Sequence, residues 1–177
     1  MNEKISTTSR FSREVTLKDG SKAVIRPIRC EDERLVYDLL NRVSKQTLIL
    51  RYHHFKPQIT PEEVKDICNV DYHNILVLAA EKKYGDRDEI VALVQYSLLK
   101  DGTSAEVSFL VDDKEQGKGI ATYMLRDLAD IARGQGIKTF IGELTAANTV
   151  MLEILKKFQP DLTEEIEDTT IKVTVRL

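Results

Sequence analysis

The chain has 177 residues, of which 42% are apolar and 31% are charged. This length and composition indicate one soluble globular domain with its own hydrophobic core. The formal net charge of −3 argues against a nucleic-acid binder that relies on neutralising phosphates. No apolar run approaches the ~18 residues of a membrane span, and residues 1–10 are too polar for a signal peptide. We therefore expect a cytoplasmic protein with no nucleic-acid partner and no membrane partner.

The first third of the chain predicts a strand pair followed by helices. Residues 1–12 are expected to form a flexible N-terminus, and residues 13–177 a single domain. Strands at 14–17 and 22–28 flank a turn, and Pro27 confines the second strand to a sheet edge or to its own end. Apolar residues at helical spacing then predict helices over 31–44 and 45–53.

The next helix carries its own start signal. Thr60 can cap it, Pro61 suits the first helical position, and Glu63 completes a capping box. This pattern predicts a helix from Pro61 to about Val70.

Three strands with short turns are predicted in the middle of the chain. The run 75–80 is wholly apolar, as in a buried strand, and strands at 89–99 and 104–111 follow it. The short links indicate an antiparallel meander.

The remainder alternates between helix and strand. Residues 120–133 form a strongly amphipathic pattern, and the polar side chains of this helix, Asp127 among them, are expected to lie away from the core. A strand at 139–144, a helix at 148–158 and a final strand pair within 162–177 follow. The class is therefore mixed α/β.

Neither the cysteines nor the histidines suggest a metal centre. Cys30 and Cys68 belong to no ligand motif, and His53 and His54 are adjacent, so a helix would point them in different directions. We expect free thiols and no bound metal.

The segment that carries chemistry runs from Val111 to Ala121. A strand leads into a loop with Gly117 and Gly119, and the loop leads into a helix. Unsatisfied N–H groups at a helix start, made approachable by glycine, can cradle a phosphate. A P-loop needs another spacing and a hydroxyl after its lysine, and a dinucleotide fingerprint needs a third glycine where this chain has Thr122. A simple tight loop remains the structural alternative.

At this point the sequence resembles a known family. Gln116 to Ala121 is similar to the Q/R-x-x-G-x-G/A motif of the GCN5-related N-acetyltransferases, and Asn148 matches an asparagine that the family often has before its last long helix. The resemblance spans about residues 22–177. It implies a central, mostly antiparallel, twisted sheet of about seven strands flanked by helices. The implied order is strand, two helices, three strands, helix, strand, helix and two strands.

A closer resemblance is to the acetyltransferase domain of bacterial and archaeal Pat-type protein lysine acetyltransferases. Its opening motif is similar to Ile25–Asp32, and its Leu-Ser and Leu-Arg-Tyr stretches are similar to Val43-Ser44 and to Leu50–Tyr52. An Ala-Glu-Val strand precedes the cofactor loop, as Ala105–Val107 does here. This resemblance favours a protein lysine as acceptor.

The resemblance implies acetyl-CoA as the co-substrate, with no metal. The pyrophosphate would bind backbone N–H groups of the cofactor loop, Thr122 could add its hydroxyl, and Leu110 and Val111 would pair with the pantetheine arm as an added strand does. Asn148 would bind that arm near the thiol. The implied cofactor-binding set is Leu110, Val111, Gln116, Gly117, Lys118, Gly119, Ile120, Ala121, Thr122 and Asn148.

Glu106 is the candidate general base. Lysine is mostly protonated at neutral pH, and only a neutral amine attacks a thioester directly in a ternary complex. Strand alternation places Val107, Phe109 and Val111 on one face, and Glu106 and Ser108 on the face expected to meet the cleft. An exposed strand residue without a catalytic role is the structural alternative.

The sequence also departs from the family. The tyrosine that many members use as general acid would fall about seven residues after Asn148, where this chain has Leu155, and no tyrosine follows Asn148 at all. Two other functions therefore remain open: acetylation of a small amine, and a CoA-binding sensor or interaction domain without catalysis.

Overall fold

The computed structural model describes residues 8–52 and 58–177. Within them lies one eight-stranded sheet, together with five α-helices and two 3-10 turns. The strands are β1 (Arg13–Thr16), β2 (Lys22–Pro27), β3 (Ile75–Tyr84), β4 (Arg87–Leu98), β5 (Ser104–Val111), β6 (Thr139–Thr145), β7 (Thr163–Glu167) and β8 (Thr170–Arg176). The helices and turns are η1 (Cys30–Asp32), α2 (Glu33–Arg42), α3 (Lys45–Tyr52), α4 (Pro61–Cys68), η2 (Asp113–Glu115), α5 (Ile120–Gln135) and α6 (Thr149–Phe158).

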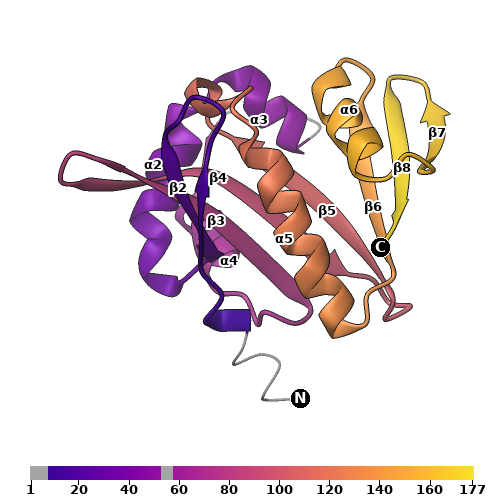
Figure 1. Cartoon of the computed structure of the whole chain (residues 1–177), viewed down its shortest axis with the longest axis horizontal. Helices are drawn as coiled ribbons and strands as arrows, with labels where there is room; N and C mark the ends of the chain where they lie inside the picture. Colours follow the sequence, from indigo (N-terminus) through magenta and orange to yellow (C-terminus); the bar gives the residue numbers. More distant parts are fainter. Residues whose placement is uncertain (1–7, 53–57) are drawn as a thin grey trace.

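The sheet has the order β1-β2-β3-β4-β5-β6-β8-β7, and every pair of neighbours is antiparallel except β5 and β6. That parallel pair is short: Ser104–Glu106 pairs with Thr139–Ile141, and the pairing ends there. Figure 1 shows the two strands drawing apart toward the end where α3 and α6 lie. The facing edge of β5 beyond Glu106 is therefore left without a strand partner.

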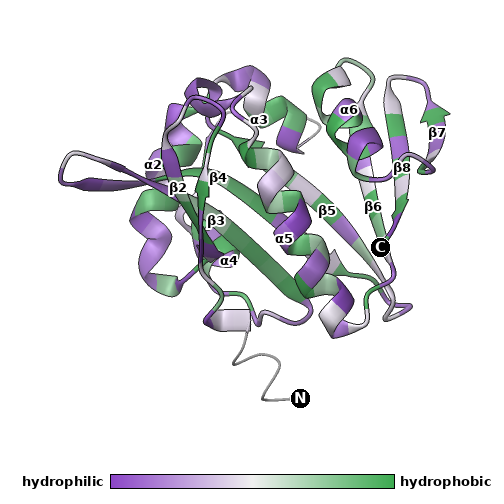
Figure 2. Cartoon of the chain, viewed as in Figure 1, coloured by the Kyte–Doolittle hydropathy of each residue, from purple (hydrophilic) through white to green (hydrophobic). Residues whose placement is uncertain are grey.

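Helices cover both faces of the sheet, and each face has its own apolar core. Figure 1 shows α5 lying across one face, and the core there includes apolar side chains of α5, α6 and seven strands, all except β7. The second core is formed by α2, α3 and α4 against β3, β4 and β5. Because both faces are covered, β3 and β4 are apolar along most of their length, as the green ribbons of Figure 2 show.

Local sequence signals account for several boundaries. Thr60 accepts from the Glu63 N–H and Glu63 accepts from the Thr60 N–H, so the predicted capping box starts α4. β2 ends at Pro27, as predicted. Gly136 ends α5 with a φ of 95°, a left-handed conformation that glycine adopts without a Cβ clash.

The structure differs from the expected pattern in three places. The sheet has eight strands where the family resemblance implied about seven, because β1 pairs with β2 at the edge of the sheet, as the strand pair predicted at 14–17 and 22–28 indicates. The helix expected over 31–44 is divided into η1 and α2. The prediction for Asp127 was wrong: its side chain is buried, because Arg13 pairs with it at 2.9 Å across the face of α5.

Residues 1–7 of the expected flexible terminus lie outside the described residues, whereas Phe11 packs on the first core. No helix in the described part of the chain is both long and apolar enough to cross a membrane.

Candidate functional site

A cavity of about 710 Å³ lies where β5 and β6 separate. It is lined by α3, β5, the loop before α5 with the first turn of that helix, the end of β6 with the turn after it, and α6. The parallel pairing holds β5 and β6 together at one end only, so the cavity is a consequence of the sheet topology. Its size is in the range of clefts that bind small molecules and cofactors.

The predicted cofactor loop lines one end of this cavity. Gly117 and Gly119 have φ values of 77° and 88°, and Gly119 is the residue immediately before α5. This left-handed backbone lets the loop turn onto the start of a 16-residue helix, whose first N–H groups have no partner within the helix. Ile120, Ala121 and Thr122 also line the cavity. The loop therefore fits a phosphate-bearing ligand.

The buried carboxylate of Glu115 anchors the cofactor loop to β3. Glu115 accepts hydrogen bonds from Lys82 at 2.7 Å, from the Tyr84 hydroxyl at 2.8 Å and from Lys118 at 3.1 Å. Burial alone would raise its pKa, but these donors hold the pKa of Glu115 below its usual value. Glu115 was not predicted from the sequence, because its partners on β3 lie more than thirty residues away.

Gln116 joins the loop to two walls of the cavity. Its side-chain amide donates to the Val111 carbonyl at 3.1 Å and to the Thr47 hydroxyl at 3.2 Å. Asp113 in the same loop accepts from the Ser44 and Thr47 hydroxyls, at 2.7 and 2.8 Å. The first motif position thus ties β5 to α3, and only its backbone N–H remains for a ligand.

Two lysines near the loop have different surroundings. The Lys118 ammonium pairs with Asp19 at 3.0 Å and with Glu115, and its side chain does not line the cavity. Lys18, in the turn between β1 and β2, does line the cavity, and its Cε lies 3.5 Å from the place of a Cβ on Gly119. Its backbone N–H donates to the Lys118 carbonyl at 3.0 Å. No sequence pattern marked Lys18, because about a hundred residues separate it from the motif.

The other predicted cofactor contacts lie along the cavity. Leu110 and Val111 are on the β5 edge that β6 leaves unpaired, and the Leu110 side chain reaches into the second core. Asn148 caps α6 by accepting from the Met151 N–H at 3.3 Å, and it lines the same cavity. All predicted cofactor residues except Lys118 therefore line one cavity.

Glu106 lies on the exposed part of β5, where its strand parts from β6. Its cross-strand partners are Ser97 on β4 and Ile141 on β6, and it lines the cavity together with Ser108. Glu143 is two residues beyond Ile141, so strand alternation places it on the same sheet face as Glu106.

Val107 packs in the first core with Phe109 and Val111 against it, and Leu110 packs in the second, so the predicted strand alternation is confirmed. Residues of both strand faces line the cavity, and a second carboxylate that the sequence did not single out, Glu143, joins Glu106 there.

The position where the family usually has its tyrosine is buried in the core of this protein. Leu155 is 3% exposed and packs in the first core. The Tyr123 hydroxyl donates to the Thr16 carbonyl at 3.2 Å and faces away from the cavity lining. Tyr52, at the end of α3, is the tyrosine that lines the cavity among the described residues, and burial raises its pKa. His53 and His54 lie outside the described residues.

Comparisons with known proteins agree with this arrangement. Residues 43–158 match the acetyltransferase (GNAT) family. An acetyltransferase of Pseudomonas aeruginosa is 25% identical over 139 residues, which is 78% of this chain and 75% of that protein. The solved GNAT domain of S. lividans PAT is 28% identical with a TM-score of 0.82, and the match covers 94% of this chain and 97% of that one.

A more distant solved structure shares the fold. The RimL ribosomal L7/L12 α-N-protein acetyltransferase, solved in complex with coenzyme A, is 14% identical with a TM-score of 0.70, over 88% of this chain and 94% of that one. The family match covers most of the chain and includes β5, the cofactor loop, α5, β6 and α6. This protein therefore belongs to the GNAT family of acetyltransferases.

Proposed function

We propose that this acetyltransferase moves the acetyl group of acetyl-CoA onto a primary amine, with a protein lysine as the acceptor class. The observation that carries the proposal is the single cavity between β5 and β6, which holds the cofactor loop at one end and Glu106 further along. A donor lying along β5 would place its phosphates on the start of α5 and its thioester near Glu106. A site arranged in this way supports direct transfer in a ternary complex.

The donor would bind through backbone groups. Its diphosphate would accept from N–H groups of Gln116 to Ala121 and from the Thr122 hydroxyl, where the α5 dipole favours negative charge, and Lys18 would add an ammonium. Its pantetheine arm would pair with the open β5 edge at Leu110 and Val111, and the Asn148 amide would bind that arm near the thiol.

The chemical step needs a base because the acceptor arrives protonated. The Glu106 carboxylate, directly or through one water, would take the ammonium proton, and the neutral amine would then attack the thioester carbon. A backbone N–H near Val111 would donate to the oxyanion that forms. Collapse expels the CoA thiolate, which would take its proton from solvent, because the usual tyrosine is replaced by the buried Leu155.

Among the described residues, three carboxylates and three cations line the cavity, and the two carboxylates where β5 and β6 diverge would favour a cationic amine at that place. Glu106, Glu143 and Glu153 line it, and Glu106 and Glu143 occupy one sheet face where the strands diverge. Carboxylates so placed attract an ammonium group before it loses its proton. The Pat domain of S. lividans, at 28% identity, supports the protein-lysine class.

Thiol release from acetyl-CoA, measured with lysine peptides, whole proteins and small amines, tests this proposal. A protein lysine acetyltransferase will release thiol with peptides or proteins and will acetylate them at lysine, as mass spectrometry would show. Turnover on small amines alone would instead establish the small-molecule alternative. Tight acetyl-CoA binding without turnover on any acceptor would establish the sensor alternative, which the absent tyrosine keeps open.

Glu106→Gln tests the base. We expect kcat at neutral pH to fall by at least about 100-fold, with acetyl-CoA affinity unchanged, because the variant removes proton transfer but keeps the shape of the site. Activity should recover partly as the pH rises toward the lysine pKa of about 10.4, where the amine loses its proton without help. Glu143→Gln is the matched control on the same face, and its pH–rate profile should keep the wild-type shape. A wild-type profile in Glu106→Gln would exclude Glu106 as the base.

A further inference from the structure

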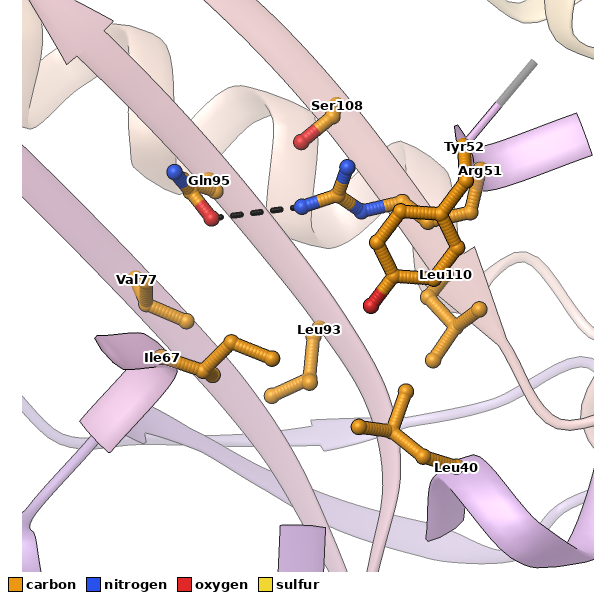
Figure 3. A pocket seen from close by; sticks show the side chains of 9 residues that line it. All are labelled: Leu40, Arg51, Tyr52, Ile67, Val77, Leu93, Gln95, Ser108 and Leu110. Carbon is orange, nitrogen blue, oxygen red and sulfur yellow. Dashed lines mark hydrogen bonds between the residues drawn. The ribbon is translucent and has the colours of Figure 1, made fainter. Parts of the chain in front are cut away.

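Arg51 occupies an unusual position at the end of α3. Its side chain is half-buried and lines both the large cavity and a second, water-sized cavity of about 10 Å³ beside it. The small cavity is otherwise mostly apolar, with Leu40, Ile67, Val77, Leu93 and Leu110 in its wall. Figure 3 shows the guanidinium reaching across the sheet toward Gln95 and Ser108.

The guanidinium meets little that can neutralise it. One of its nitrogens donates to the Gln95 carbonyl oxygen at 3.3 Å, and its carbon lies 5.0 Å from the centre of the Tyr52 ring. Across residues 8–52 and 58–177, no carboxylate pairs with it within 4.0 Å, and the segment 53–57 that follows contains no Asp or Glu. Burial accordingly lowers the pKa of Arg51, which the nearby charge of Glu106 opposes.

The desolvation cost of the Arg51 guanidinium is only partly offset by its contacts. A guanidinium carries five N–H donors in a planar fork that matches a carboxylate, and a partly buried charge held by a neutral amide and an aromatic face keeps much of its desolvation cost. Arg51 is also open to the large cavity, so an anion arriving there could satisfy it without any movement of the sheet.

The surface in front of Arg51 is polar. Gln95 pairs with Ser108 across β4 and β5, and Ser97 pairs with Glu106 one step along the same face. Gln95 is held by its own amide, which donates to the Ser97 hydroxyl at 3.0 Å. Ser108 is two residues from Glu106, a spacing of about 7 Å along a strand. An anion at Arg51 would therefore lie within one small molecule's length of the candidate base.

We propose that Arg51 binds a carboxylate carried by the acceptor, so that the preferred amine has an acidic group several bonds away. This inference rests on the proposed acetyltransferase function and deepens its acceptor class. Two sources of that carboxylate fit the same chemistry: the α-carboxylate of a free amino acid such as lysine, and an acidic residue beside the acceptor lysine of a peptide.

Matched acceptor pairs separate these sources. Lysine and lysinamide share the same ε-amine and differ in the carboxylate, and a peptide with Lys-Asp differs from its Lys-Asn counterpart in the same way. We expect the wild-type protein to prefer the acidic member of at least one pair by about tenfold or more in kcat/KM, through KM. The pair that shows the preference identifies the source.

Arg51→Gln should reduce that preference to less than about threefold while leaving the KM for acetyl-CoA unchanged. Arg51→Lys keeps the charge but loses the planar fork, so it should restore only part of the preference. Lys157→Gln removes another cation from the same cavity and should keep the wild-type preference. Thermal unfolding of each variant confirms that it is folded.

Three results would overturn the inference. One is a wild-type protein that does not distinguish either pair. Another is an Arg51→Gln variant that loses activity equally on both members of a pair, which would mean that Arg51 acts on Glu106 or on the fold. The third is an Arg51-dependent preference for succinyl-CoA over acetyl-CoA, which would assign the anion to the donor. Calorimetry of the same pairs with CoA present gives a readout that does not need turnover, so a failure of the proposed function is distinguishable.

Discussion

Two arginines enter the interior of this protein and meet opposite surroundings. Arg26 on β2 donates to both oxygens of Asp32, at 2.7 and 2.8 Å, and to Glu81 at 3.0 Å. Arg51 on α3 meets, among the described residues, one neutral amide, the face of the Tyr52 ring and a cavity. Arg26 belongs to an ion cluster that joins β2, η1 and β3, whereas Arg51 has N–H donors without a protein acceptor in the described part of the chain. The difference teaches that the partners of a buried charge, rather than its burial, separate architecture from a candidate binding residue.

The largest expected effect is on stability. Arg26→Met should lower the free energy of unfolding by about 3–5 kcal/mol, because it leaves the buried Asp32 carboxylate without its cation. Arg51→Met should change it by no more than about 1 kcal/mol, since it gives up one neutral hydrogen bond and relieves a buried charge. Urea denaturation of both variants measures the difference. Equal losses of unfolding free energy in the two variants would contradict the difference drawn between Arg26 and Arg51.

The dependence of stability on acidic pH tests the same cluster through Asp32, the carboxylate that Arg26 binds. Burial would raise the pKa of Asp32, but Arg26 and the Arg29 backbone N–H hold it below its usual value. A carboxyl with a lowered folded pKa stabilises the fold above its unfolded pKa, about 3.9, and that stability is lost as the pH falls through the folded value. Asp32→Asn should therefore cost about 2 kcal/mol at pH 7 and less below pH 4. A cost that stays constant from pH 7 to pH 3 would contradict the pairing.

Lys18 and Lys118, near the cofactor loop, differ in the same way: one lines the cavity and the other is paired with carboxylates. Lys18→Met should weaken CoA binding by about tenfold and reduce its salt dependence, because the Lys18 ammonium faces the cavity. Lys118→Met should weaken it less, since that ammonium is held by Asp19 and Glu115. Calorimetry with CoA and with dephospho-CoA checks this. If Lys18→Met affected CoA but not dephospho-CoA, Lys18 would contact the 3′-phosphate rather than the diphosphate.

The proposed donor half of the site could be predicted from the sequence more fully than the acceptor half. The cofactor loop is one continuous segment in which glycine spacing, a preceding strand and a following helix can all be recognised. The acceptor half is assembled from α3, β4, β5 and β6, and its polar face combines Gln95, Ser97, Glu106 and Ser108 through cross-strand pairing. No local pattern marks such a face, because its members meet only when the strands align.

By itself, the sequence determined most secondary-structure elements and indicated the donor that we propose. Hydrophobic periodicity, the Thr60 capping box and the glycine loop are properties of short segments, so they predicted most helices and strands and the place of a phosphate. Tertiary structure decided what depends on distant partners. It separated Lys18 from Lys118, buried Asp127 and Leu155, and gave Arg51 no carboxylate partner within residues 8–52 and 58–177. The physical reason is that charge and burial act through space, and the sheet order determines which residues become neighbours.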